Sequence, residues 1–216
     1  MKIKNLLLFA FLLFNFFVNA QIKATISGMS YTIETVDITV DNLTIILNGD
    51  GEIQRFYPDI SNGTTDYYDT SIFNAYRAGK IKNIGGLSVD YWDSMSKDDP
   101  KYGKIKSIGN VKIDYWDSVN FDQEKTGKVK SIGNLTVDYY PKDIIDNSRF
   151  GKLKSIGNIS IQYGLKDIID DSTFQKLIKF GPVSLDYWND KIFDKEKFGK
   201  LKSINGNSKE LNVVVL

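Results

Sequence analysis

Short runs of alternating apolar and polar residues fill the chain from residue 79 onward, and nearly the same run returns every 24 residues. The copies read GKIKNIGGLSVDYW at 79–92, GKIKSIGNVKIDYW at 103–116, GKVKSIGNLTVDYY at 127–140 and GKLKSIGNISIQYG at 151–164, then more loosely QKLIKFGPVSLDYW at 175–188 and GKLKSINGNS at 199–208. A fixed period of this length indicates a tandem array of one structural unit. Each copy has two segments rich in β-branched and aromatic residues around Gly-Asn, Gly-Gly or Gly-Pro. This pattern predicts a β-hairpin with a two-residue type II′ turn, in which the first residue has positive φ and the second has negative φ.

The alternation breaks at one place in each copy. Val111, Ile113 and Tyr115 are two residues apart and share a face, whereas Ile105 and Ile108 are three apart and would face opposite sides of a regular strand. Both of these positions are apolar in every full copy. We therefore expect a β-bulge near Lys106 and Ser107 that turns both inward. The alternative is a sheet whose two faces are both partly covered.

The repeat defines an all-β fold class. We expect an antiparallel meander of tandem hairpin repeats, about 24 residues each, that forms one large curled or coiled sheet, because more than about ten strands rarely stay flat. The alternative is a closed, wide β-barrel in an outer membrane, although strands of about six residues are shorter than the 9–11 residues that span a bilayer. Residues 21–50 are interpreted as divergent N-terminal hairpins and residues 51–216 as the tandem repeats of the same domain.

Residues 1–20 have the pattern of a secretory signal peptide. Lys2 and Lys4 precede a Leu/Phe-rich run, and the small-residue exit ends at Ala20. The pattern predicts export to the periplasm, the cell surface or the medium, without a helical membrane anchor.

Composition narrows the function. The chain has no Cys and no His, so most catalytic triads, imidazole metal sites and thiolate chemistry lack their residues. Without Lys2 and Lys4, 26 basic residues face 27 acidic ones, which disfavours a nucleic-acid partner. The departures from the repeat, Gln162-Tyr163-Gly164 and Gly181-Pro182, add no catalytic group. We expect a non-enzymatic protein with no catalytic residue, metal site or cofactor; a carboxylate-based glycan-active enzyme is the remaining enzymatic alternative.

The segment DYWDSVNFDQEKTGKVKSIG resembles the YD-repeat hairpin of RHS-type proteins. Tyr115, Asp117, Gly127, Lys128 and Val129 occur in comparable order, with a longer spacer and Lys in place of Arg. The repeat region is also similar to β-hairpin repeat proteins of unknown function that Gram-negative bacteria export. The first resemblance implies a wrapping β-sheet shell, and the second implies an exported scaffold without a defined activity.

Charged residues repeat as well. Lysines at 80/82, 104/106, 128/130, 152/154 and 200/202 and aspartates at 90, 114, 138 and 186 would line up in stacked hairpins. Cross-strand Lys/Asp pairs are the favoured interpretation, and a basic stripe for an acidic polysaccharide, lipid phosphates or DNA is the alternative. The loop aspartates at 98, 122, 146, 170 and 194 are interpreted as turn caps, with calcium ligation as the alternative.

An aromatic position recurs at the end of each hairpin. If the first residue of pairs such as Tyr115-Trp116 points inward, the second points outward, and stacked copies place Trp92, Trp116, Tyr140 and Trp188 in one column. Such rings suit the apolar face of a sugar, so these four residues are the candidate ligand-binding residues and an extracellular or cell-envelope polysaccharide is the candidate partner. The alternative is that the rings pack against the sheet.

Overall fold

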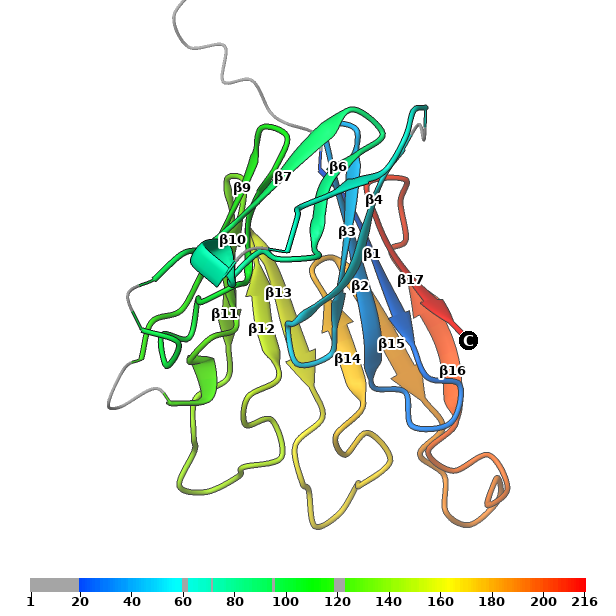
Figure 1. Ribbon diagram of the computed structural model, residues 1–216. Coiled ribbons are helices and arrows are strands. Elements are labelled where there is room, and N and C mark those ends of the chain that lie inside the picture. The colour runs from blue at the N-terminus through cyan, green and yellow to red at the C-terminus, as the bar shows by residue number, and fades with distance from the viewer. Residues whose placement is uncertain (1–19, 60–61, 71, 95, 119–122) are drawn as a thin grey trace, which may run out of the picture.

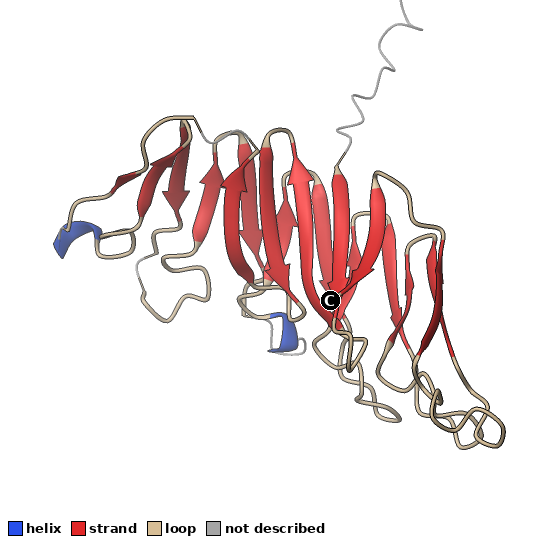
Figure 2. Cartoon of the chain, turned by 90° about the vertical axis from the view of Figure 1, so that its right-hand side faces the viewer, coloured by secondary structure: helices blue, strands red, loops and turns tan. Residues whose placement is uncertain are grey.

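The computed structural model describes residues 20–59, 62–70, 72–94, 96–118 and 123–216, and is all-β with 45% strand and 3% helix. Apart from Ala20, the predicted signal peptide lies outside the described residues. The strands form two sheets, one of 12 strands and one of five (Figures 1 and 2). The all-β fold class and the antiparallel hairpin meander are confirmed.

The larger sheet is a meander in which each strand pairs with its sequence neighbours. Its strands are β5 (Asp66–Tyr67), β6 (Ile81–Ile84), β7 (Leu87–Tyr91), β8 (Ile105–Ile108), β9 (Val111–Tyr115), β10 (Val129–Ile132), β11 (Leu135–Tyr139), β12 (Leu153–Ile156), β13 (Ile159–Tyr163), β14 (Leu177–Phe180), β15 (Val183–Tyr187) and β16 (Leu201–Asn205). Two short 3-10 helices, η2 (Ile72–Asn74) and η3 (Gln123–Lys125), lie in its loops. The end strands β5 and β16 do not pair with each other, so the sheet stays open and the closed-barrel alternative was wrong.

The predicted bulge lies between successive hairpins. Tyr91 pairs with Ile105 and Asp90 pairs with Ser107, which leaves Lys106 as the extra residue. In the next two copies, the extra residues of the equivalent bulges are Lys130 and Lys154. The bulge turns the first and last residues of each short strand to the same face, which is why apolar residues three apart share one core.

The turns carry the expected backbone signs at most copies. Gly109, Gly133, Gly157 and Gly181 have φ between +54° and +59°, and the residue after each has negative φ. Glycine adopts this positive φ without steric cost. At Gly85 and Gly86 both φ values are positive, so this turn takes the sign pattern of type I′ instead of the predicted type II′.

In each hairpin of the larger sheet, the two strands form ladder pairs only at the two positions beside the turn. Further from the turn the strands separate, and tyrosine hydroxyls connect them. Within the β12–β13 hairpin the pairs are Ser155 with Ser160 and Ile156 with Ile159. Lower down, the hydroxyl of the second strand's last Tyr donates to the carbonyl of the first strand. These bonds join Tyr91 to Ile81 (3.0 Å), Tyr139 to Val129 (2.8 Å) and Tyr187 to Leu177 (2.6 Å). The repeated Tyr therefore supplies a donor that the ladder lacks.

The smaller sheet brings both ends of the described chain together. It has the order β17-β1-β2-β3-β4 and contains β1 (Gln21–Ile26), β2 (Ile33–Val40), β3 (Leu43–Asn48), β4 (Ile53–Pro58) and β17 (Leu211–Val215). β17 pairs with β1 in parallel, while the remaining pairs are antiparallel.

The two sheets share one hydrophobic core that includes Ile38 and Ile45 from the smaller sheet and Ile132 and Phe180 from the larger one. Between the layers, the Tyr139 hydroxyl lies 3.3 Å from the carbonyl oxygen of Gly51, and the Leu177 amide donates to Tyr31 at 2.9 Å. Strand β6, near the free end of the larger sheet, contains no fully buried residue. The smaller sheet therefore covers only part of the larger one, whose opposite face we call the outer face.

Candidate functional site

The sequence-predicted aromatic residues lie in register on the outer face, where we call them the aromatic column. Its members are Tyr68, Trp92, Trp116, Tyr140 and Trp188, and all five are half-buried. Each hairpin adds two strands, so successive rings follow at a pitch of about 10 Å. The structure thus places Trp92, Trp116, Tyr140 and Trp188 at equivalent positions.

The polar atoms of the first four rings are bound to backbone. Each ring reaches the next hairpin and donates to a carbonyl 21 residues further along the chain. The bonds are Tyr68 to Val89 (3.0 Å), Trp92 to Ile113 (3.1 Å), Trp116 to Val137 (3.2 Å) and Tyr140 to Ile161 (2.6 Å). These rings therefore complete the hydrogen bonding of opened hairpins, which gives the column a structural role.

A cation lies over each ring of the column. Nine residues after each aromatic residue, a basic side chain is 4.5–5.2 Å from the ring centroid: Arg77 over Tyr68, Lys101 over Trp92, Lys125 over Trp116, Arg149 over Tyr140 and Lys197 over Trp188. Tyr always pairs with Arg and Trp with Lys. Lys106, Lys130 and Lys202 add a second cation at each Trp. A sugar stacking on a Trp ring would have to displace a lysine.

The predicted Lys/Asp pairs are confirmed for the second lysine of four copies, whereas the predicted Asp186 accepts from Ser203 at 2.9 Å instead. Nζ–O distances of 3.4–3.8 Å join Lys82 to Asp66, Lys106 to Asp90, Lys130 to Asp114 and Lys154 to Asp138. Lys101 also contacts Asp114 at 2.9 Å. The pKa of Asp114 lies below its ordinary value, because these contacts outweigh the opposing effect of burial, which is the largest single influence. The outer face is therefore a charge-balanced ladder.

The first lysine of the five copies between residues 79 and 188 has a different role. Lys128 donates to the carbonyl of Gly151 at 2.6 Å and its Nζ lies 4.9 Å from the centroid of the Tyr139 ring. Lys80 repeats the arrangement with Gly103 and Tyr91. Burial lowers the pKa of Lys80, Lys104, Lys128, Lys152 and Lys176. Lys80 and Lys128 therefore connect successive repeat copies through side-chain to backbone hydrogen bonds.

The last tyrosine of each hairpin points into the core, and burial there changes the pH at which its hydroxyl ionises. Burial raises the pKa of Tyr91 to about 12 and also raises that of Tyr115, Tyr139, Tyr163 and Tyr187. Because unfolded phenols ionise near pH 10, the folded state should lose stability as the pH rises from 10 through about 12. A spectrophotometric titration at pH 11 should show a deficit of about four phenolates among the 12 tyrosines relative to the chain in denaturant. Equal titration of folded and unfolded chains would contradict this packing.

One copy departs from the others on the outer face. Gly164 takes the place of the aromatic residue, and with it the cation becomes Thr173, the ladder lysine becomes Ile178 and the ladder aspartate becomes Gln162. In this copy, four positions that carry an aromatic or charged residue in the neighbouring copies are all occupied by uncharged, non-aromatic residues. An open hollow of about 610 Å³ lies here, lined by these four residues and by Tyr140, Arg149, Leu165, Lys166 and Asp167 among others.

The long loops that connect successive hairpins lie at one end of the strands, and the two-residue turns lie at the other end (Figures 1 and 2). We call the end with the long loops the loop edge. Adjacent apolar residues occupy the loop tips: Ile144-Ile145, Ile168-Ile169 and Ile192-Phe193. Their exposed fractions are 101% and 95%, 100% and 87%, and 75% and 86%. Such values mean that the side chains contact little of their own chain. We call these residues the tip pairs.

Aspartates hold the tip pairs in place. Asp143 accepts from the amide of Ile145 at 2.9 Å, and Asp167 does the same for Ile169 at 2.8 Å. Asp190 accepts from both Ile192 and Phe193 at 2.8 Å. Of the predicted turn caps, Asp146 and Asp170 accept from the amides of Ser148 and Ser172, whereas Asp122 lies outside the described residues. The prediction was wrong for Asp98 and Asp194, because Asp99 accepts from the Lys101 amide in place of Asp98 and Asp194 accepts from the Lys197 side chain.

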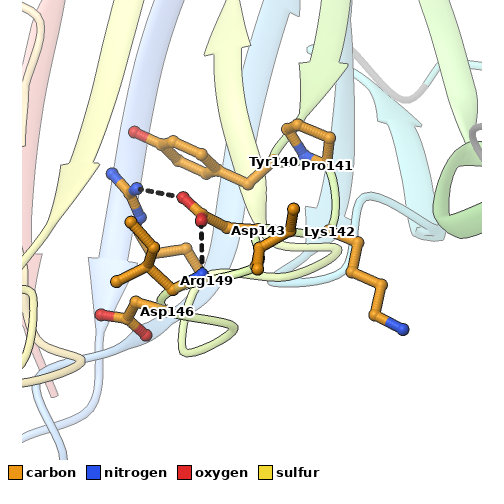
Figure 3. A pocket seen from close by; sticks show the side chains of 8 residues that line it. Tyr140, Pro141, Lys142, Asp143, Asp146 and Arg149 are labelled. Carbon is orange, nitrogen blue, oxygen red and sulfur yellow. Dashed lines mark hydrogen bonds and ion pairs between the residues drawn. The ribbon is translucent and has the colours of Figure 1, made fainter.

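A second hollow of about 550 Å³ lies within the loop that carries Ile144 (Figure 3). Arg149 spans it, lying over the Tyr140 ring and 4.0 Å from Asp143. The Nε atom of Arg149 is buried without a hydrogen-bond partner. Tyr140 and Arg149 line both hollows, so the two meet at this pair of residues.

Two features of this surface were missed from the sequence. The repeated loops contain adjacent apolar residues every 24 positions, and such pairs lie outside any alternating strand pattern. The aromatic residue and the cation nine positions later also change together, as the Tyr/Arg, Trp/Lys and Gly/Thr pairings show. Both signals are legible in the repeat alignment.

No protein-family model, curated protein or solved structure matches the chain. Within the described ranges, no helix has the length and apolar character needed to cross a membrane. The same part of the chain has no group of three or more His, Cys, Asp or Glu side chains placed to hold a metal ion. The candidate surfaces are thus the loop edge and the hollow at Gly164.

Proposed function

We propose that the protein is an exported, non-enzymatic β-repeat scaffold that attaches to a zwitterionic lipid surface through the tip pairs. The observation that carries this proposal is the near-complete exposure of six large apolar side chains at three successive loop tips. Exposed apolar clusters of this kind mark interaction sites. The absence of His and Cys and the repetition of nearly every charged position support a scaffold over an enzyme.

The form of the tips favours lipid over a protein partner. Each pair protrudes from a loop fixed by an aspartate, and the hairpins that carry successive pairs are about 10 Å apart. A bilayer interface accepts separate apolar tips without shape complementarity, whereas a protein partner requires a closely packed patch. The loops 141–150, 165–174 and 189–198 together carry six basic and eight acidic residues, so a zwitterionic surface fits better than an anionic one.

Co-sedimentation of residues 21–216 with phosphatidylcholine vesicles tests this function. Replacing Ile168 and Ile169 by serine should lower the partition coefficient about tenfold, since transfer of each side chain contributes about 1 kcal/mol or less when insertion is shallow. Replacing both by leucine keeps the apolar surface and should leave partitioning within twofold. Binding that is unchanged in the serine variant, or that is absent from the unmodified chain, would contradict the proposal.

A further inference from the structure

The hollow at Gly164 is a gap in the aromatic column. In the four preceding copies, an aromatic ring donates a hydrogen bond to the carbonyl 21 residues further on. Gly164 has no ring that could reach the residue 21 positions further on, Leu185. A Cβ atom built on Gly164 would lie 2.0 Å from the carbonyl oxygen of Thr173, so the present backbone leaves no room for a side chain.

At Gly164 the two residues that supply cations over each Trp ring of the column are uncharged, and the basic residues of the lining are Arg149 and Lys166. In the three Trp copies, one cation nine residues and another 14 residues after the ring lie over it. Here the corresponding residues are Thr173 and Ile178. A ring that enters the gap would therefore contact a hydroxyl and an apolar branched side chain at these two positions.

The lining suits a neutral sugar ring better than an aromatic side chain. Ile178 and Leu165 provide an apolar contact, and Gln162, Lys166 and Asp167 provide donors and acceptors around it. A pyranose has one apolar C–H face and several hydroxyls, so a lining that combines apolar and polar side chains suits both parts of its surface. An indole or phenol carries one polar group and would leave most of this polar lining unmatched.

We infer that the gap at Gly164 binds a neutral pyranose unit of a glycan, with the apolar face of the ring against Ile178 and its hydroxyls towards Gln162, Lys166 and Asp167. The volume of about 610 Å³ falls within the range of ligand sites. Unlike an aromatic platform along the whole column, this site is confined to one copy and leaves Trp92, Trp116 and Trp188 in structural roles. It does not depend on lipid binding at the tip pairs.

The test compares two double variants by isothermal titration calorimetry. Gln162→Asp with Ile178→Lys restores the Lys/Asp pair found at the neighbouring copies, so it should fold normally while placing a charged side chain in the gap. We expect its affinity for the best ligand of a panel of neutral hexasaccharides (β-1,4-glucan, β-1,4-linked N-acetylglucosamine and α-1,6-glucan) to fall at least tenfold. Asp138→Gln with Lys154→Ile is the matched control beside Tyr140, and its affinity should stay within twofold.

Several outcomes would overturn the inference. They are the absence of binding by every hexasaccharide, an unchanged affinity in the Gln162→Asp/Ile178→Lys variant, or equal losses in both variants. Binding of N-acetyl-tryptophanamide without binding of any saccharide would also overturn it and assign the gap to an aromatic side chain of a protein. Vesicle binding by the same variants should remain unchanged, which separates this result from the test of the tip pairs.

Discussion

Replacing Tyr139 by alanine is expected to lower the free energy of unfolding by about 4 kcal/mol, the largest effect of any single substitution considered. The Tyr139 side chain is fully buried between the two sheets. Its hydroxyl lies 2.8 Å from the carbonyl oxygen of Val129 and 3.3 Å from that of Gly51, and Lys128 lies over its ring. The alanine variant leaves a cavity and removes the donor that links the layers.

Thermal and urea denaturation of the 21–216 chain would measure this effect. For a domain of this size, about 4 kcal/mol corresponds to a fall in melting temperature of about 10 °C. Tyr139→Phe is the matched control, since it keeps the ring and removes only the hydroxyl, and should cost about 1–2 kcal/mol. A loss below 1 kcal/mol in the alanine variant would mean that the two sheets are not joined at Tyr139.

Replacing Trp116 by alanine is expected to lower the free energy of unfolding by about 3 kcal/mol, near the lower end of costs for large aromatic residues because the ring is half-buried. The variant loses the hydrogen bond to Val137 at 3.2 Å. It also loses contacts with Lys125 and Lys130, whose Nζ atoms lie 5.0 and 5.3 Å from the ring centroid. Each cation–ring contact contributes about 0.5–1 kcal/mol at such a position.

A neighbouring copy of the repeat suggests a compensating pair of substitutions at Trp116 and Lys125. Tyr140 and Arg149 form the equivalent pair one copy later, so Trp116→Tyr with Lys125→Arg should recover stability to within about 1 kcal/mol of the unmodified chain. Denaturation midpoints of the single and double variants measure the coupling. If Trp116→Ala kept full stability but lost polysaccharide binding, the column would be a ligand platform instead of a structural feature.

Local features of the fold follow from the repeat. The three-residue spacing of Ile105 and Ile108 predicts the bulge, and the bulge at Lys106 confirms it. Its consequence for the lysines was harder to foresee. In a regular strand Lys128 and Lys130 would share one face, yet the bulge at Lys130 turns that residue toward the ladder and leaves Lys128 beside Tyr139. The sequence interpretation favoured Lys/Asp pairing for both lysines, with a basic stripe as the alternative.

The packing of the smaller sheet on the larger one could not be predicted from local sequence patterns. The parallel pairing of Leu211 with Ile22 joins opposite ends of the described chain, and nothing in either strand specifies its partner. The candidate site shows a similar limit. The change at Gln162 and Gly164 was visible in the sequence, but only the contacts of Thr173 and Ile178 at the equivalent positions identify it as a gap.

Lipid attachment through the tip pairs is tested most directly by electron paramagnetic resonance depth measurements on single nitroxide labels, since the chain has no cysteine to remove. Labels would be placed at Ile169→Cys on the loop edge and at Asn134→Cys in a turn at the opposite edge. With phosphatidylcholine vesicles, the label at 169 should gain accessibility to oxygen and lose accessibility to a water-soluble nickel complex, while the label at 134 remains unchanged. Equal, water-like accessibility of both labels on vesicle-bound protein would contradict attachment through the tip pairs.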